Sequence, residues 1–381
     1  MINSIQPKYH RLIELLEGRL FRIPYYQRSY SWESRQKTDL FEDITKTYLK
    51  DTSHFMATIV CLKRQDEIRK VGSKELFIYD IVDGQQRITT LVALLKAISL
   101  GLKTVSIEEQ EESNEIEKLL VKGENKDLIL LQTNHNEADL FMEYLRDAVI
   151  PDKNRIKTLA EKNLYDLFIS CKKFVSNWKD KDGRKIIDLL SVVKNRLGFI
   201  FYEIDDESIV YTVFEVLNSR GLDVNWLDKA KSVLMGIVYE KFGKFSNSKE
   251  YIQRLQSYWG EIYKILGIKD INGDEILTFT ASFLYSEKDK GKLYSTEVSL
   301  DFFKEFSYKN IDNILKIART ILLVADKIKE LSDIPEYRFF YSIQQARYLY
   351  VAIMTNNLLT KDVKIEALWY WEKITLEHMD C

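Results

Sequence analysis

Short apolar runs alternate with helical patterns in the N-terminal part of the chain. Residues 55–62 (FMATIVCL) and 76–82 (LFIYDIV) are rich in β-branched and aromatic side chains, which is typical of strands. The charged residues between them, 63–74, predict a turn. Residues 88–100 (ITTLVALLKAISL) follow the second run and predict a largely buried helix. A much later run, residues 197–204 (LGFIFYEI), also predicts a strand, and we expect it to return to the N-terminal sheet.

Beyond residue 226 the apolar positions recur at three-four spacing, which predicts a mostly helical region. The clearest stripe consists of Ile311, Ile314, Ala318, Ile321, Ala325 and Ile328. Only 14 glycines and 4 prolines occur in 381 residues, and this scarcity also favours long helices. The final segment, residues 364–380, predicts an amphipathic helix with Trp369 and Trp371 and no glycine cap. Either the chain is shortened relative to its relatives, or the apolar face of this helix meets another chain.

The order of these elements predicts an α+β fold with a small mixed sheet, followed by a mostly α-helical C-terminal domain. We expect the first domain to be discontinuous and to comprise residues 1–105 and 195–240. Residues 106–194 then form a mostly helical insertion. It begins with the acidic stretch SIEEQEESNEIEK, which is either a surface linker or an exposed helix. Residues 241–381 form the helical C-terminal domain.

Composition narrows the class of protein without naming an activity. Apolar residues make up 45% and charged residues 30%, as in soluble globular proteins, and no apolar run reaches membrane-spanning length. The net charge of −2 predicts that any contact with DNA uses a local basic patch. The three cysteines are far apart and odd in number, which favours a reducing, cytoplasmic location. The four histidines show no metal-ligand spacing, so a zinc site is not expected.

The segment Asp83-Gly84-Gln85-Gln86-Arg87 joins the second predicted strand to the helix that follows. A helix N-terminus presents unpaired N–H groups and the positive end of a dipole, which together favour phosphate. Gly84 permits a tight turn and the approach of an anion, and Arg87 offers a planar donor fork for phosphate oxygens. Gln85 and Gln86 are candidates to orient a water molecule or to contact a base. Asp83 is a candidate to hold a magnesium ion through water or to position a nucleophile.

Two hydroxyl groups extend this candidate site. Thr89 and Thr90 lie in the first turn of the predicted helix and are further candidates for nucleotide contact. The alternative interpretation is structural: a tight turn before a buried helix, with Asp83 as the N-cap and Arg87 paired on the surface. Spacing alone does not separate the two interpretations, because short motifs often match by chance.

An aromatic loop precedes the first long predicted helix. Residues 23–32 (IPYYQRSYSW) contain three tyrosines, a tryptophan, a glutamine and an arginine. Aromatic faces can stack on bases, and a guanidinium can bind phosphate. We therefore predict nucleotide contacts for Tyr26, Gln27, Arg28 and Tyr30. The proline and the tryptophan of the loop are instead expected to shape the backbone and fill the core.

A third polar segment, residues 214–222 (FEVLNSRGL), ends one predicted helix before another begins. Gly221 suits a left-handed C-cap, and Asn225 suits the N-cap of the next helix. A plain connection between helices explains these two residues. It does not explain Asn218 and Arg220, which are candidates to face a cleft.

Together the three motifs predict a common cationic cleft, in which Arg28, Arg87 and Arg220 neutralise a polyphosphate. Taken in order, residues 23–32, 82–90 and 214–221 resemble the N-terminal domain of the GmrSD-type modification-dependent restriction enzymes. The nucleotidase core of that family is related to ParB and sulfiredoxin. Three ordered motifs are far more specific than any one of them alone.

The resemblance implies a ParB/sulfiredoxin-like domain that binds and hydrolyses a nucleoside triphosphate, with magnesium as a cofactor and the segment Asp83 to Arg87 as the catalytic signature. It also implies recognition of modified DNA, such as glucosylated hydroxymethylcytosine or phosphorothioate DNA, in defence against phage. Relatives often carry a C-terminal HNH nuclease domain, but we find no His-centred metal motif, and His378 stands alone. We therefore expect no DNA cleavage by this chain alone. Either a nuclease partner supplies it, or the chain is a truncated version.

Three functions are open at this point. The first is an NTP-hydrolysing sensor subunit of a restriction system. The second is a nucleotide-gated module that binds DNA or a partner without significant turnover. The third is an interaction scaffold, whose C-terminal helices dock a nuclease partner or a second copy of the chain.

Overall fold

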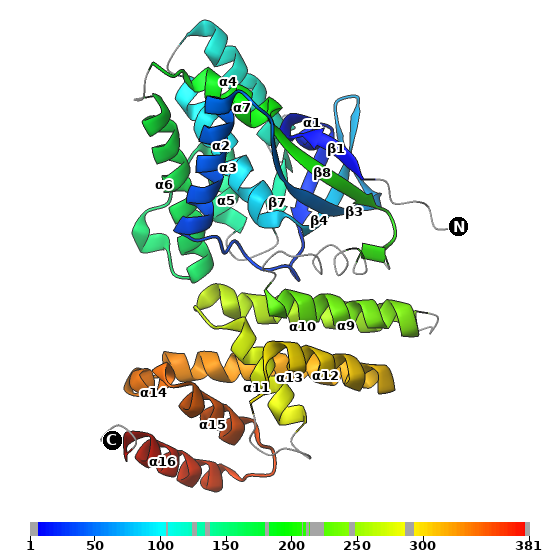
Figure 1. Ribbon diagram of the computed structural model, residues 1–381, viewed down its shortest axis with the longest axis vertical. Helices are drawn as coiled ribbons and strands as arrows, with labels where there is room; N and C mark the ends of the chain where they lie inside the picture. Colours follow the sequence, from blue (N-terminus) through cyan, green and yellow to red (C-terminus); the bar gives the residue numbers. More distant parts are fainter. Residues whose placement is uncertain are drawn as a thin grey trace. The chain divides into compact units, whose positions relative to one another are not determined.

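The computed structural model describes most of the chain in two compact units. It describes residues 7–103, 106–123, 128–133, 138–179, 183–207, 209–210, 213, 225–243, 248–285 and 293–377. The units are Met1–Phe214 and Glu215–Cys381. The first contains a sheet and helices, and the described part of the second is helical (Figure 1). The α+β class predicted from the sequence is therefore confirmed.

The first unit is built on a mixed six-stranded sheet with strand order β1-β8-β3-β4-β2-β7. These strands are β1 Lys8–Arg11, β2 Arg19–Ile23, β3 His54–Val71, β4 Lys74–Asp83, β7 Leu131–Thr133 and β8 Leu197–Ile204. A short pair, β5 Val121–Lys122 and β6 Leu128–Ile129, forms a second sheet. Strand β8 runs parallel to β3 and antiparallel to β1, which confirms that the late apolar run returns to the N-terminal sheet.

Strands β3 and β4 form a long antiparallel hairpin, and this corrects the predicted turn over residues 63–74. Strand β3 continues through the charged residues to Val71, with a register shift between Arg64 and Ile68. Only Gly72 and Ser73 separate the two strands. Charged side chains are compatible with a strand here because this part of the hairpin is largely exposed.

Helices cover one face of the sheet (Figure 1). The first unit contains α1 Leu12–Leu16, α2 Ser34–Lys50, α3 Gln85–Leu102, α4 Ile107–Leu120, α5 Ala138–Asp147, α6 Leu159–Lys179 and α7 Ile186–Asn195. One core joins Phe21 and Ile81 of the strands to these helices, and α3 is buried along almost its whole length, as predicted. The acidic stretch after residue 105 forms the helix α4, which packs against α3.

The second unit is a stack of helices. They are α9 Trp226–Phe242, α10 Ser248–Ile268, α11 Gly273–Leu284, α12 Thr296–Lys309, α13 Ile311–Asp333, α14 Arg338–Ser342, α15 Gln344–Thr355 and α16 Lys361–Glu377. The predicted stripe along α13 is buried from Ile314 to Ile328, and α10, α11, α12 and α15 pack around this helix. Among the described residues, no helix is both long and apolar enough to cross a bilayer.

The division between the two units differs from the predicted boundary at residue 240. Helix α9 packs against α10, α11 and α12 and is grouped with them, not with the sheet. Residues 106–194 are mostly helical, as expected, but α4 and α6 share the core of the first unit with α3. The partition into a discontinuous domain and an insertion stays a prediction.

Candidate functional site

The turn between β4 and α3 depends on a glycine. Gly84 is the N-cap of α3 and has a φ of 91°, in the left-handed region that side chains rarely adopt. A Cβ atom at this position would lie 2.2 Å from Cδ1 of Ile59. The Asp83 carboxylate accepts a hydrogen bond from the Gly84 N–H at 2.8 Å, so the predicted role of Asp83 as N-cap is replaced by this contact. The predicted strand–turn–helix geometry is present.

The N-cap of α3 is Gly84, which has no side chain that could cap the helix. The first N–H groups of a helix have no partner within the helix, and its dipole places a partial positive charge at this end. The turn therefore offers donors and positive potential to an anion.

Gln86 holds the aromatic loop against this turn. Its Oε1 accepts from the Ser31 N–H at 2.9 Å, and its Nε2 donates to the Ser29 carbonyl at 3.1 Å. Gln27 adds a third bond, from its buried Nε2 to the Val82 carbonyl at 3.1 Å. The structure thus brings together two motifs that are far apart in the sequence. The side-chain amides of Gln27 and Gln86 both bind backbone groups and hold the loop against the turn.

Three of the predicted nucleotide-binding hydroxyls face the protein interior. Tyr30 and Thr90 are buried, with their oxygens 2.9 Å apart, and Thr90 also donates to the Gln86 carbonyl at 2.8 Å. Thr89 is buried and donates to the Gln85 carbonyl at 2.8 Å. Burial raises the pKa of the Tyr30 phenol. The Tyr30–Thr90 contact fastens the loop to the first turn of α3, and the other two bonds lie within that turn.

Arg87 is half-buried in the first turn of α3. Its guanidinium carbon lies 6.0 Å from the ring centroid of Trp32, at the end of the aromatic loop. Burial lowers the pKa of Arg87, and the charge of Asp83 raises it. Within the described ranges, no carboxylate lies within 4.0 Å of this guanidinium, so the predicted surface ion pair is not seen there. An arginine stays protonated even when burial disfavours its charge, and an anion would relieve that cost.

Gln85 is a second residue at the turn with a polar side-chain atom that lacks a partner among the described residues. Its side chain is buried, and its Oε1 has no hydrogen-bond partner among them. Buried acceptors are nearly always satisfied by protein or water. A donor from a ligand or a water molecule therefore fits this position.

An ion cluster beside the site was not predicted from the sequence. Asp80 is buried on β4, and its two oxygens each lie 2.5 Å from an Nε atom, one of Arg22 and one of Arg64. Arg22 also donates to Glu67 at 2.8 and 3.0 Å. The available signal was an aspartate inside the apolar run FIYDIV, because a buried charge in a strand requires partners.

The outcome differs among the other predicted site residues. Tyr26 is buried and Arg28 is half-buried, both in the aromatic loop. Asn218, Arg220 and Gly221 lie outside the described residues, so the three-arginine cleft stays a prediction. Among the residues that the structure describes, no three His, Cys, Asp or Glu side chains gather as a metal site.

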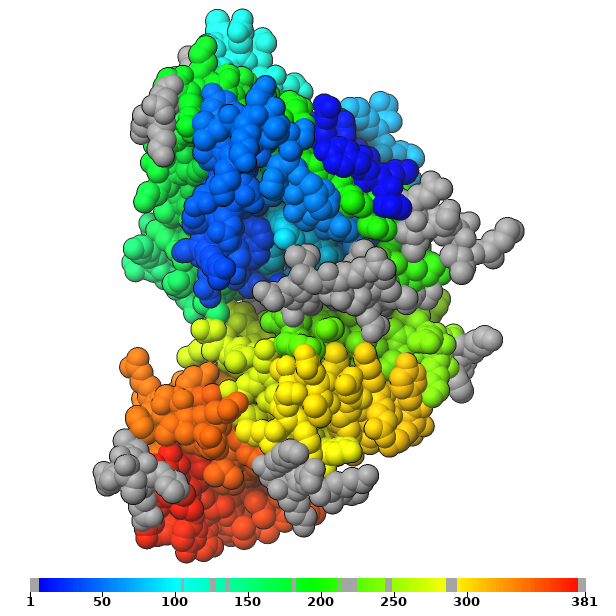
Figure 2. Space-filling view, viewed as in Figure 1, coloured from blue at the N-terminus to red at the C-terminus, as the bar shows by residue number. Residues whose placement is uncertain are grey.

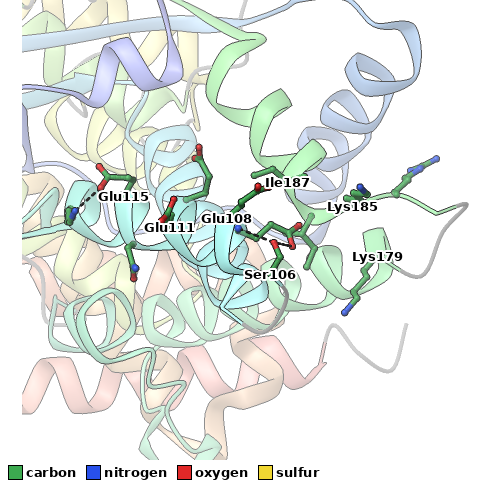
Figure 3. A pocket seen from close by; sticks show the side chains of 13 residues that line it. Ser106, Glu108, Glu111, Glu115, Lys179, Lys185 and Ile187 are labelled. Atoms are coloured by element: carbon green, nitrogen blue, oxygen red, sulfur yellow. Dashed lines mark hydrogen bonds and ion pairs between the residues drawn. The ribbon is translucent and has the colours of Figure 1, made fainter.

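Two cavities lie elsewhere in the first unit. One, of about 960 Å³, is lined by α4 on one side and by the end of α6 and the start of α7 on the other. Glutamates such as Glu111 lie on the first wall, and Lys179 and Lys185 lie on the second (Figure 3). Another, of about 320 Å³, is lined by Leu100 of α3, Tyr144 of α5 and other residues. Neither contains a residue of the two motifs, so neither is the predicted nucleotide site.

Comparison with known proteins identifies the family. No curated protein matches the chain. The family model of the GmrSD restriction endonuclease, N-terminal domain, matches residues 12–235, which is more than half of the chain. This range includes the aromatic loop, the β4–α3 turn and residues 214–221. The chain therefore belongs to the GmrSD N-terminal domain family, whose members are components of DNA-restriction systems.

Proposed function

We propose that this chain binds and hydrolyses a nucleoside triphosphate at the β4–α3 turn, as the sensor subunit of a modification-dependent restriction system. The observation that supports this most is the environment of Arg87. Arg87 is a half-buried cation in the first turn of a helix whose N-cap is a glycine, with no carboxylate within 4.0 Å in the described part of the chain. A phosphate group would supply a negative charge beside Arg87 and accept hydrogen bonds from the N–H groups at the start of α3.

The residues at the turn divide the work as follows. Gly84 allows the tight turn that starts α3, and Arg87 neutralises the charge that develops during phosphoryl transfer. Asp83 is the residue that would hold a magnesium ion, which would neutralise phosphate charge, or it orients the attacking water. Gln85 offers its Oε1 to that water or to a base N–H. Gln86 and Gln27 keep the aromatic loop in place, where Tyr26 and Arg28 are the groups proposed to contact the nucleotide.

DNA recognition and DNA cleavage belong to different parts of this restriction system. The family acts on DNA in restriction systems. We assign to this chain the recognition of modified DNA, coupled to the nucleotide, and to a nuclease partner the cleavage of the strand. Adding DNA that carries the modification should therefore stimulate phosphate release by this chain, whereas unmodified DNA should not.

The test is phosphate release with each ribonucleoside and deoxyribonucleoside triphosphate, with and without magnesium. Arg87→Ala should reduce turnover by about 100-fold or more, since the clamp acts on the transition state. Arg146→Ala is the matched control, because Arg146 is an exposed arginine of α5 paired with its neighbour Asp147. Full activity of Arg87→Ala, in a protein that folds normally, would defeat the proposal.

A second candidate is a nucleotide-gated module without significant turnover. It is favoured by two observations. The Gln86 amide is bound to backbone groups and does not orient an attacking water, and Asp83 is the one acidic side chain in residues 83–87. Calorimetric binding of a triphosphate without phosphate release would select this candidate. If no nucleotide raises the melting temperature, a scaffold role is left, since any ligand selective for the folded state stabilises it.

A further inference from the structure

Helix α16 of the second unit is held by one face only. Trp371 is buried, and its Nε1 donates to the Ala346 carbonyl of α15 at 2.9 Å. The Trp371 ring also packs near Tyr350, at 5.6 Å between centroids. Thr375, one helical turn later, is buried as well. In Figure 2 this helix, in red, lies at the surface of its unit.

An apolar seam runs along α16 beside its buried face. It comprises Val363, Ala367, Tyr370 and Ile374, at successive spacings of four, three and four residues. The exposed fractions of the three large members are 44% for Val363, 50% for Tyr370 and 49% for Ile374. Four-three spacing is the pattern by which one helix packs along another, so the seam has the form of half a coiled-coil interface.

Charged residues on the outer edge of the seam indicate what covers it. Glu366 and Lys373 are both exposed and lie one heptad apart on that edge. When two copies of such a helix pack antiparallel, residues of the same edge face each other, and the order of the copies is reversed. Glu366 of each copy then meets Lys373 of the other, so the pair forms twice. In a parallel pair this edge would instead face the edge that carries Trp371, so Glu366 and Lys373 of the two copies would not meet.

We propose that α16 is a self-association surface, on which a second copy of this chain packs antiparallel through the Val363–Ile374 seam. The antiparallel register places Val363 opposite Ile374 of the partner subunit and Ala367 opposite Tyr370 of the partner subunit. Isologous contact of this kind closes a two-fold dimer and leaves no open end. This inference uses the second unit only and is independent of the nucleotide site.

The seam is short, which sets the expected strength. Eleven residues separate its ends, or roughly 17 Å along a helix. A contact of this length falls in the small class of interfaces, below about 1,200 Å². We therefore expect a monomer–dimer equilibrium that depends on protein concentration, and not a permanent dimer.

The experiment is sedimentation equilibrium of the full chain over a range of concentrations. Tyr370→Glu or Ile374→Glu should weaken dimerisation by at least about tenfold, because the two-fold axis places each charge in the interface twice. The matched controls are Ile365→Glu, at a side chain of α16 that is 58% exposed and outside the seam, and Leu358→Glu, at a side chain that is 93% exposed ahead of α16. The controls should dimerise like the wild type. A chain that is monomeric at all concentrations, or a dimer that responds equally to both sets, overturns the proposal.

Charge exchange tests the orientation. Glu366→Lys alone and Lys373→Glu alone should each weaken the dimer, and the double exchange should restore it. Cysteine pairing gives a second reading, in a background with Cys381→Ser. Val363→Cys and Ile374→Cys variants should form a disulfide when mixed and not when each is alone. Efficient pairing of Val363→Cys with itself, or a double exchange that fails to restore the dimer, would contradict the antiparallel arrangement.

Discussion

The phenolic oxygen of Tyr30 lies 2.9 Å from the hydroxyl oxygen of Thr90 and donates to it. The direction follows because Thr90 has one hydroxyl proton and gives it to the Gln86 carbonyl. This bond fastens the aromatic loop to the first turn of α3 inside the core. The aromatic loop and the β4–α3 turn are therefore joined by a buried contact, in addition to the amide bonds of Gln86.

Removing the Tyr30 hydroxyl should loosen this connection. Tyr30→Phe leaves the ring in place and takes one buried hydrogen bond from Thr90, so the free energy of unfolding should fall by about 1 kcal/mol. Chemical denaturation measures it. Tyr9→Phe, at a tyrosine that is 58% exposed, is the control and should change nothing measurable. A Tyr30→Phe protein as stable as the wild type would show that the bond is not formed in solution.

Substitution of Gly84 should be costly for two separable reasons. An alanine at a φ of 91° is strained by about 1–2 kcal/mol, and its Cβ would also collide with Cδ1 of Ile59 at 2.2 Å. Ile59→Val removes that methyl group. We expect Gly84→Ala to lower the melting temperature, and Gly84→Ala with Ile59→Val to lower it less than the sum of the two single changes. Strict additivity would mean that the collision is relieved some other way.

The ion cluster at Asp80 should be sensitive to loss of its central charge. Asp80→Asn leaves Arg22 and Arg64 close together without their shared carboxylate. Since both arginines keep some solvent contact, we expect about 2–3 kcal/mol of destabilisation. Glu75→Gln is the control, because Glu75 belongs to an exposed pair with Lys70 and should cost less than about 0.5 kcal/mol. Equal effects of the two changes would contradict the assignment of Asp80 as the anchor.

The contact between α3 and α4 predicts a dependence of stability on pH. Burial raises the pKa of Glu117, but hydrogen bonds from Lys96 and Ser99 and the charges of Lys96 and Lys103 outweigh burial, so its pKa lies below 4.5. A carboxyl group with a lowered folded-state pKa adds stability above its unfolded-state pKa and loses that contribution as the pH falls through the folded-state value. Wild-type stability should therefore fall as the pH drops below about 4.5.

The control for this prediction is Glu117→Gln, measured by urea denaturation at pH 7 and at pH 4. The variant should be less stable than the wild type at pH 7, because Lys96 is buried and loses its counter-ion. The difference between variant and wild type should narrow at pH 4. A constant difference at both pH values would show that Glu117 does not titrate in this range.

Local pattern was enough for the elements of the sheet and for the turn at Gly84. The runs at 55–62, 76–82 and 197–204 each became a strand, because alternation and β-branched composition act over a few neighbouring residues. The predicted turn over residues 63–74 was wrong because local composition does not show that a charged segment pairs with another strand. Its charged residues lie on an exposed hairpin, where a strand is stabilised by pairing with β4 and not by burial.

The roles of individual polar side chains depended on contacts between distant segments. The sequence predicted a contact with water or a base for Gln86 and nucleotide contacts for Tyr30 and Thr90, yet in the fold each one bonds to the loop or to α3. Asp80 was passed over, although its partners Arg22 and Arg64 lie on neighbouring strands. Pairing of this kind is set by strand order, which periodicity does not reveal.

By itself the sequence determined the α+β class, the helical second half, the family motifs and the need for glycine between β4 and α3. These follow from residue preferences and short spacings, which act along the chain. Only the tertiary structure decided which polar groups at the turn form hydrogen bonds or ion pairs within the protein. Among the described residues, the Gln85 side-chain carbonyl oxygen has no hydrogen-bond partner and the Arg87 guanidinium has no ion-pair partner. Whether a buried polar group is satisfied depends on the partners that folding brings within about 3 Å, and those partners come from remote parts of the sequence.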